Sequence, residues 1–207
     1  MVMSNAVRWA RSVPRALGAT ALLGALATGT AAAQTLSRPG FWMDAGVSYG
    51  RLRLTCDTGC ARIVAVNGPA YTVTVGGAVS QNVLLGVEGQ SWVNTGGATQ
   101  QVRSVTAVVQ WYPWPAAKFF VRGGVGIVQS TVSLTADTTG AHTAKGSGVA
   151  LTVSAGYDFR VTQHFGVAVQ AATHVAALGD LAVGGAVSNT KGVIAYVSRI
   201  GVALVYR

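Results

Sequence analysis

Charge is the scarcest property of this 207-residue chain, because only 10% of its residues are Asp, Glu, Lys or Arg. Acidic residues are the rarest of these, six against 15 Lys and Arg, and the basic residues form no run. Nucleic-acid binding depends on a clustered basic stripe, so we expect no nucleic-acid partner. A mild, dispersed cationic excess is better suited to the acidic lipids of a membrane surface.

Long hydrophobic runs are also missing after residue 33, where no stretch reaches the length of about 18 residues that a helical membrane span needs. The mean hydropathy is nevertheless +0.43, which is high for a soluble domain. The apolar residues instead come in short pieces that alternate with small or polar residues, as required of a strand with lipid on one side and a barrel lumen on the other. The first piece alternates Phe41, Met43, Ala45, Val47 and Tyr49 with Trp42, Asp44, Gly46, Ser48 and Gly50.

Eight such pieces predict an all-β protein, an eight-stranded antiparallel up-and-down transmembrane β-barrel. The expected strands cover residues 41–54, 69–79, 83–93, 101–112, 118–131, 148–160, 164–175 and 191–206. The connections after the second, fourth and sixth strands are short, and the others are long. In outer-membrane barrels the short turns are periplasmic and the long loops extracellular. We therefore expect a bacterial outer-membrane location with both termini in the periplasm.

Aromatic residues gather at the strand ends that this orientation assigns to the periplasm, where an interfacial girdle is expected. They are Phe41, Trp42, Trp111, Tyr112, Trp114, Phe119, Phe120, Tyr157, Phe159, Phe165 and Tyr206. A thinner girdle at the other end would consist of Tyr49, Tyr71, Trp92 and Tyr196. A soluble all-β domain is the alternative interpretation, because soluble sandwiches also carry aromatics at strand ends.

The N-terminus indicates export. Arg8, Arg11 and Arg15 precede an uncharged, alanine-rich stretch over residues 16–33, which predicts a secretory signal peptide at 1–33 and a barrel domain at 34–207. A membrane-anchoring helix is the alternative, although three glycines within the stretch make it a poor span. Without the signal the chain has 12 basic and 6 acidic residues, because three of the 15 arginines and lysines belong to the signal.

Several segments, in this order, resemble the small eight-stranded outer-membrane β-barrel superfamily of the OmpA and OmpX type. They are Gly40-Phe41-Trp42, residues 46–50, Gln110-Trp111-Tyr112-Pro113, residues 119–126, Gly156-Tyr157-Asp158-Phe159 and the alternating last strand ending in Tyr206. The resemblance implies insertion by the barrel-assembly machinery, which reads a terminal aromatic residue. Here Tyr206 is penultimate and Arg207 is last. We expect no periplasmic domain after the barrel.

The alternation places a small set of charges on the lumen face. They are Asp44, Glu88, Arg122, Asp158 and Arg199, with Arg160 at the periplasmic rim. An unpaired charge in so narrow a lumen would be costly, so we expect ion pairs such as Glu88 with Arg122 or Arg199, joined by Gln110 and Gln170. A polar core that holds the barrel together is the favoured interpretation, and a gated pore is the alternative.

Three arginines, Arg51, Arg53 and Arg103, lie near the extracellular strand ends on the register that otherwise faces lipid. An outward arginine at this depth can reach lipid phosphates. We therefore expect contacts with the phosphorylated sugars of lipopolysaccharide, and a solvated rim is the alternative.

Cysteine is nearly absent, and the two that exist lie four residues apart as Cys56 and Cys60 around a turn that contains Gly59. In an exported protein this spacing predicts a disulfide within the first extracellular loop. A metal site would need further ligands, and none lies nearby in sequence.

No catalytic, cofactor or metal-binding set emerges. The histidines are His142, His164 and His174, and His174 has no serine two residues further on. The glycines at 123, 124 and 126 lie within a strand rather than before a helix, so they form no phosphate loop. We expect a non-enzymatic outer-membrane barrel that contributes to envelope structure or surface interaction through its extracellular loops, whose ligand is unknown. A lipid A-modifying enzyme and a narrow channel or small-ligand carrier are the alternatives.

Overall fold

The computed structural model describes residues 40–55, 65–96, 99–114, 116–134, 142–179, 182–183, 186–187 and 192–207. The chain divides into two units, Met1–Gln34 and Thr35–Arg207, and the description concerns the second. The expected signal peptide and the expected Cys56–Cys60 disulfide lie outside the described residues. Within the described ranges, no helix has the length and hydropathy that crossing a bilayer requires.

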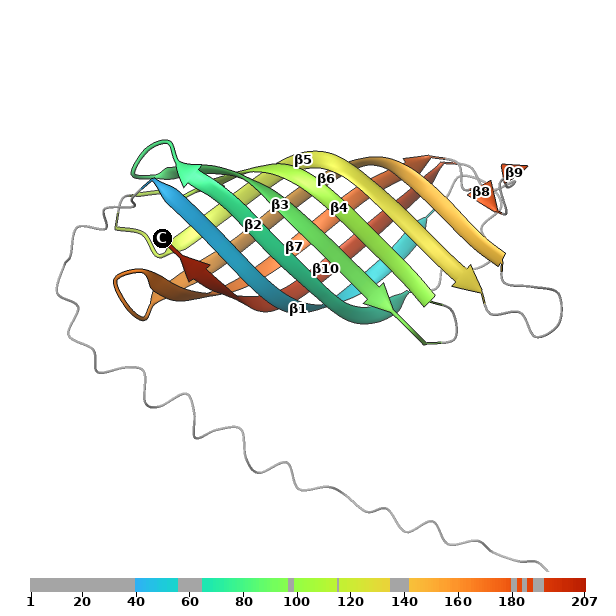
Figure 1. Ribbon diagram of the computed structural model, residues 1–207, viewed down its shortest axis with the longest axis horizontal. Helices are drawn as coiled ribbons and strands as arrows, with labels where there is room; N and C mark the ends of the chain where they lie inside the picture. Colours follow the sequence, from blue (N-terminus) through green and yellow to red (C-terminus); the bar gives the residue numbers. More distant parts are fainter. Residues whose placement is uncertain are drawn as a thin grey trace, which may run out of the picture. The chain divides into compact units, whose positions relative to one another are not determined.

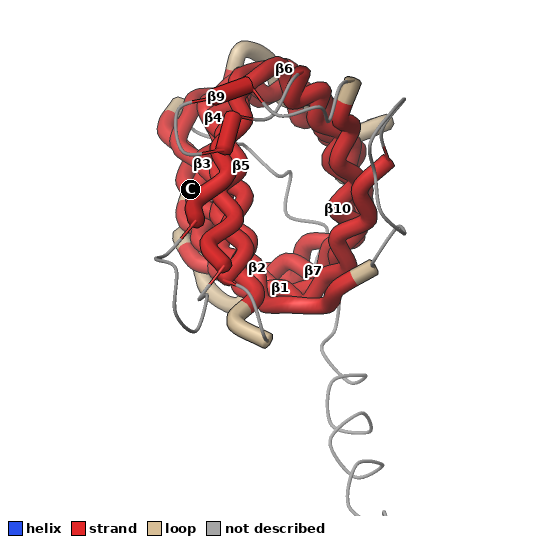
Figure 2. The backbone as a smooth tube through the Cα atoms, turned by 90° about the vertical axis from the view of Figure 1, so that its right-hand side faces the viewer, coloured by secondary structure: helices blue, strands red, loops and turns tan. Residues whose placement is uncertain are grey.

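Eight long antiparallel strands form a closed barrel, which Figure 1 shows from the side and Figure 2 from one end. They are β1 (Phe41–Thr55), β2 (Val66–Ala78), β3 (Val83–Asn94), β4 (Thr99–Trp111), β5 (Phe119–Leu134), β6 (His142–Arg160), β7 (Phe165–Gly179) and β10 (Val193–Tyr206). Each pairs with the next long strand along the chain, and β10 pairs with β1. The predicted all-β, eight-stranded up-and-down architecture is confirmed.

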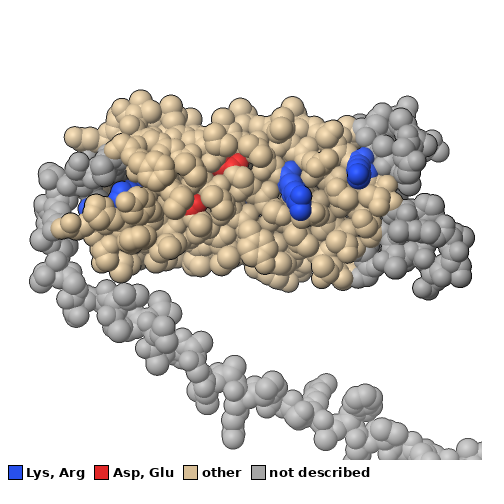
Figure 3. All heavy atoms as spheres, in the orientation of Figure 1, with Lys and Arg blue, Asp and Glu red and all other residues tan. Residues whose placement is uncertain are grey.

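Side chains alternate between the outer face and the lumen along every long strand. On β4, the even-numbered residues from Val102 to Gln110 are buried, whereas the odd-numbered residues from Arg103 to Trp111 are exposed. The exposed positions form a belt of large apolar side chains, such as Val47, Val125 and Ile127, which are 56%, 63% and 69% exposed. Figure 3 shows one face of this belt, which carries few charged residues. An exposed apolar belt of this extent is suited to hydrocarbon rather than to water.

The two ends of the barrel differ. Short connections at residues 79–82, 112–118 and 161–164 share one end with the first residue of β1 and the last of β10, and we call this the turn end. Four backbone hydrogen bonds of 2.8 to 2.9 Å join neighbouring segments there: Ala78 N to Gly40 O, Tyr112 N to Asn82 O, Asp158 N to Lys118 O and Arg207 N to His164 O. Backbone hydrogen bonding between neighbouring segments therefore continues into the turn end of the barrel. The opposite end, with the longer connections, is the loop end.

The predicted aromatic girdles are partly wrong. Trp42, Tyr112 and Phe120 at the turn end and Trp92 near the loop end are at most 1% exposed and point into the lumen. The physical reason is alternation itself: Phe41 and Trp42 are consecutive, so only one of the two can face outward. The outward aromatics at the turn end are Phe41, Trp111, Trp114, Phe119, Tyr157, Phe159 and Phe165, and those near the loop end are Tyr49, Tyr71 and Tyr196.

Some strands also extend further than the sequence indicated. β6 begins at His142 rather than near Gly148, because its first residues pair with β5 from Leu134 to Gln129. This extension is polar, so it lacks the apolar alternation that predicts a strand. Backbone hydrogen bonds between strands do not require that alternation, so the strand forms nevertheless. Two short strands, β8 (Ala182–Val183) and β9 (Ala186–Val187), lie within the expected last loop, and β8 pairs with β6.

Two glycines on β5 provide a matched test of the packing between strands. A Cβ on Gly126 would lie 2.0 Å from the carbonyl oxygen of Val105 on β4, whereas a Cβ on Gly123 would meet nothing within 4 Å. We predict that Gly126→Ala lowers the free energy of unfolding by about 1–3 kcal/mol because the β4 backbone must move. Gly123→Ala should leave it nearly unchanged. Urea unfolding in detergent, followed by the gel mobility of the folded barrel, measures both variants, and equal effects would contradict this packing.

Candidate functional site

The lumen contains two apolar clusters and a set of buried polar side chains. An apolar cluster at the turn end contains Trp42, Leu84, Val108, Tyr112, Ala117, Phe120, Ala168, Ala203 and Val205. A second apolar cluster towards the loop end contains Leu52, Ala70, Trp92, Val102, Val128, Ala150, Ala176, Leu178, Val193, Ala195 and Val197. Buried polar side chains from all eight long strands occupy the lumen besides these clusters. We call the charged and hydrogen-bonded part of this set the lumen network.

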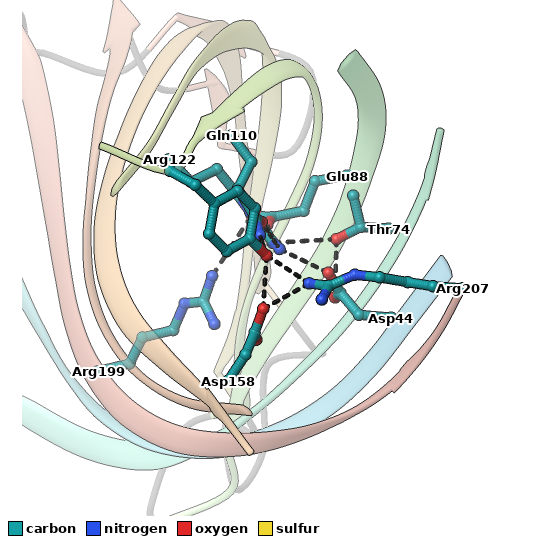
Figure 4. A network of polar contacts seen from close by, with 9 residues as sticks. Asp44, Thr74, Glu88, Gln110, Arg122, Asp158, Arg199 and Arg207 are labelled. Atoms are coloured by element: carbon teal, nitrogen blue, oxygen red, sulfur yellow. Dashed lines mark hydrogen bonds and ion pairs between the residues drawn. The ribbon is translucent and has the colours of Figure 1, made fainter. Parts of the chain in front are cut away.

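Arg122 on β5 is the centre of the lumen network (Figure 4). Its Nη2 lies 2.5 Å from Oδ2 of Asp44 on β1, and its Nη1 lies 2.7 Å from Oε2 of Glu88 on β3. Nη1 also donates to Thr74 Oγ1 at 3.2 Å, while Nε and Nη2 donate to Gln110 Oε1 at 2.8 and 2.6 Å. A guanidinium has five N–H donors, so these five contacts account for all of them. One side chain therefore joins five strands.

Arg122 is also surrounded by aromatic rings and shielded from solvent. Its Cζ lies 5.1 Å from the ring centroid of Trp42 and 5.7 Å from that of Phe120. The guanidinium therefore makes cation–π contacts with two aromatic rings in addition to its hydrogen bonds. Asp44 is fixed in turn by Thr74, whose hydroxyl donates to Oδ1 at 2.9 Å. Because Arg122 is only 3% exposed, its charge is stabilised by these partners rather than by water.

Arg199 on β10 reaches the same network from the other side of the barrel. Its Nη2 lies 3.3 Å from Oε1 of Glu88, so Glu88 is shared between two arginines. Asp44 and Glu88 balance Arg122 and Arg199, and the charges of this group sum to zero. The Arg199 pair is the looser one, because Nε and Nη1 of Arg199 have no hydrogen-bond partner among the described residues.

A second ion pair lies nearer the turn end and continues the network. Arg207 Nη2 lies 2.5 Å from Asp158 Oδ2 and also donates to the hydroxyl of Tyr112. That hydroxyl lies 2.5 Å from Asp158 Oδ2 and accepts from Gln110 Nε2 at 2.5 Å. Gln110 therefore links the two groups, and the terminal residue Arg207 lies folded into the lumen rather than exposed at the rim.

All five charged residues that the sequence assigned to the lumen are at most 9% exposed and lie inward. Four of them are joined directly by ion pairs, and the fifth, Asp158, pairs with Arg207 and is linked to the others through Tyr112 and Gln110. Sequence reasoning missed Arg207, Tyr112 and Thr74. The alternation could have identified all three, because the inward positions are odd-numbered on β10 and even-numbered on β2 and β4. Gln170, which was expected to join the ion pairs, is buried but makes no side-chain hydrogen bond to them. Arg160 is exposed at the turn end and donates to the backbone oxygen of Gln163 at 2.8 Å.

Two buried polar side chains outside the network, Gln90 and His174, have no hydrogen-bond partner for either polar atom among the described residues. His174 interacts electrostatically with Arg199 and Glu88. His174 is buried on the lumen side rather than facing lipid, and no hydroxyl or acid among the described residues is hydrogen-bonded to it, unlike a lipid-facing catalytic histidine. Asp180 and Ser188, the acid and the hydroxyl of the fourth long loop that the sequence suggests as partners of His174, lie outside the described residues. The described ranges contain no group of three His, Cys, Asp or Glu side chains that could hold a metal ion.

The outer face has the opposite electrostatic character. Arg51, Arg53 and Arg103 are exposed on the outward register towards the loop end, and so is Lys145 on β6. Lys118 and Arg160 are exposed near the turn end. All three acidic residues in the described ranges, Asp44, Glu88 and Asp158, are turned inward. The charged residues with exposed side chains on the described surface are therefore all cationic.

Comparison with solved structures defines the fold. Neisserial surface protein A superposes with a TM-score of 0.52 and 14% identity, over 80% of this chain and 96% of that one. The attachment invasion locus protein Ail of Yersinia pestis gives a TM-score of 0.51 and 12% identity, over 81% of this chain and 99% of that one. This chain has the fold of a small outer-membrane β-barrel. Ail has also been solved in complex with the heparin analogue sucrose octasulfate. No protein-family model and no curated protein matches this barrel.

The central position of Arg122 in this barrel can be tested by graded substitution. We predict that Arg122→Met lowers the free energy of unfolding by about 3–5 kcal/mol, because it leaves Asp44 without a cationic partner. Arg199→Met removes only the 3.3 Å contact with Glu88 and should cost much less. The double variant Asp44→Asn, Arg122→Met should recover most of the loss, because Glu88 and Arg199 remain as a pair and no charge is left unpaired. Urea unfolding measures all three, and a larger cost for Arg199→Met would contradict the assignment.

Proposed function

We propose that this protein is a non-enzymatic structural barrel of the bacterial outer membrane, in which a sealed lumen stabilises the fold and outward arginines bind the phosphates of lipopolysaccharide. Its extracellular loops supply the contribution to envelope structure or surface interaction. The observation that carries the proposal is the complete sorting of charge in the described residues: every acid is paired inside the lumen, and every outward charge is cationic.

The packing of side chains in the lumen supports a structural role. Apolar clusters fill the lumen towards both ends, and the lumen network joins strands on opposite sides of the barrel. A network in which Arg122 satisfies all its donors rigidifies a core and specifies one packing. Among the described residues, no hydrogen bond joins His174 to a hydroxyl or an acid.

The outward arginines support contact with lipopolysaccharide. Arg51 lies ten residues beyond Phe41 along β1, which places it about 26 Å above the turn-end aromatics for a strand tilted by about 40°. The apolar band of such barrels is about 25 Å tall, so Arg51 reaches the headgroup layer. A guanidinium binds phosphate through two parallel hydrogen bonds, which suits it to a phosphorylated sugar.

Orientation and biogenesis belong to the same proposal. With the turn end in the periplasm, both chain termini are periplasmic and the longer connections face outside, as in other outer-membrane barrels. Residues 1–33 act as the signal peptide, and Cys56 and Cys60 form a disulfide in the first extracellular loop. The barrel-assembly machinery inserts the chain. Tyr206, whose ring lies 5.2 Å from that of Phe165, offers it the outward aromatic surface at the end of the last strand.

One observation favours a channel as a second candidate. The unpartnered polar atoms of Gln90, His174 and Arg199 lie within the lumen and could support a narrow hydrated path. We nevertheless predict that the purified protein shows no conductance above a protein-free lipid bilayer, because Trp42 and Trp92 belong to apolar clusters towards the two ends. Planar-bilayer recording measures this, with insertion verified by the gel mobility of the folded protein. Discrete, voltage-stable conductance steps would favour the channel.

Lipid contact is tested separately. The triple variant Arg51→Gln, Arg53→Gln, Arg103→Gln should lower lipopolysaccharide affinity on the order of 100-fold, since each cation at a membrane surface contributes about 1 kcal/mol. The matched control is Lys118→Gln, Arg160→Gln, which removes exposed cations at the turn end and should change nothing. Native mass spectrometry of the detergent-solubilised barrel measures the lipopolysaccharide-bound fraction. An unchanged fraction in the triple variant would refute the arginine contacts.

A further inference from the structure

The outer wall of the barrel is hollowed on one side. A groove with a volume of about 600 Å³ runs across β6, β7, β10 and β1, with contributions from β5 and β2. This volume falls within the range of about 300–1,000 Å³ that is typical of small-molecule sites. The groove faces outward, because its outward-register residues, such as Tyr49, Ala171 and Ile200, are exposed.

Side-chain size explains the hollow. The floor consists of the small outward side chains Ala155, Ala171, Thr173 and Ser198, which lie on three adjacent strands. Larger side chains rise on both sides: Val121 and Val153 on β5 and β6, and Tyr49 and Ile200 on β1 and β10. Ala171 pairs with Ala155 on one side, so the floor is continuous across β6 and β7. On its other side Ala171 pairs with the larger Ile200 of β10, which forms part of the groove wall.

The floor is compatible with hydrocarbon despite its two hydroxyls. Thr173 Oγ1 and Ser198 Oγ lie 3.4 Å apart across the β7–β10 pair, so each hydroxyl has the other as its hydrogen-bond partner. Thr173 is eight residues beyond Phe165 along β7, which places it roughly 20 Å above the turn-end aromatics. The groove therefore lies in the part of the apolar belt nearer the loop end.

One end of the groove is cationic. Arg51 lines it, and the register places Arg51 beside Ser198 on β10 and Asn67 on β2. Arg53, two residues further along β1, is exposed on the same face. The groove thus combines an apolar floor within the belt with a guanidinium and an amide at the headgroup layer.

We propose that this groove binds one acyl chain of a phosphorylated glycolipid of the outer leaflet, lipid A, with the phosphate of the same molecule held at Arg51. The inference rests on the lipid contact proposed above and deepens it, because it assigns the hydrocarbon as well as the phosphate. Charge complementarity selects this occupant. A second copy of the barrel would bring Arg51 and Arg53 against other outward cations, since no acid lies on the described outer face.

The test separates the two halves of the ligand. Ala171→Leu fills the floor of the groove and leaves Arg51 intact. Ala107→Leu on β4 adds the same bulk at an exposed outward position that does not line the groove. The probes are bis-phosphorylated lipid A, the same lipid A without phosphates, and its fully deacylated phosphorylated disaccharide. Native mass spectrometry of the folded barrel measures bound fractions, and gel mobility confirms folding of each variant.

We expect Ala171→Leu to lower the affinity for bis-phosphorylated lipid A by at least about tenfold, because several methylene groups lose their burial. It should leave the affinity for the deacylated disaccharide unchanged, and Ala107→Leu should leave both unchanged. Arg51→Gln should weaken both phosphorylated probes but not the dephosphorylated lipid A.

Three results would overturn the groove assignment, and one of them would also refute the lipid contact at Arg51. If Arg51→Gln weakens binding while Ala171→Leu does not, the phosphate contact stands and the groove fails. If neither weakens binding, the proposed lipid contact at Arg51 fails as well. If the barrel is dimeric and Ala171→Leu makes it monomeric, a second copy occupies the groove instead of lipid.

Discussion

Closure of the backbone ladder between β1 and β10 is the constraint on which the rest of the structure depends. The two strands pair without interruption from Met43 with Tyr206 to Thr55 with Ile194, so every long strand has a neighbour on each side. Such closure is required in hydrocarbon, where an unpaired N–H or C=O has no water to bind. It also leaves each side chain only two directions. On β1 the even-numbered residues face the lumen and the odd-numbered ones face outward, and one rule therefore places Asp44 inside and Arg51 outside.

The two faces then acquire opposite chemistry. Inside, Arg122 binds Asp44, Glu88, Thr74 and Gln110, and apolar clusters lie towards both ends of this charge-neutral network. Outside, an apolar belt carries cations towards its two ends and, in the described residues, no acid. A barrel built in this way is stabilised from within and is attracted to anionic lipid from without. Both parts of the proposed function follow from this division, and neither needs a catalytic group.

Alternation in the sequence was sufficient to predict the fold and the inward direction of the lumen charges, because both depend only on parity. The prediction of an aromatic girdle is wrong for Trp42, because the parity of β1 makes Phe41 and Trp42 face opposite sides of the barrel wall. The expected pairing of Glu88 with Arg122 or Arg199 is also present, since Glu88 binds both arginines. The pair of Asp44 on β1 with Arg122 on β5 was not predicted, because it depends on strand tilt and stagger, which no local pattern encodes. The outer groove was equally hidden, because its floor combines small residues from strands that are distant in sequence.

The central claim is that alternation divides the barrel into a lipid-facing belt and a sealed lumen, and tryptophan fluorescence tests it most directly. Single-tryptophan variants that retain Trp42, Trp92 or Trp111 would be folded into bilayers and exposed to brominated lipids and to aqueous iodide. Brominated lipids should quench Trp111, which is 48% exposed on the outer face. Neither quencher should reach Trp42 or Trp92, which are at most 1% exposed within the lumen. Strong iodide quenching of Trp92, or quenching of Trp42 by brominated lipid, would contradict the account.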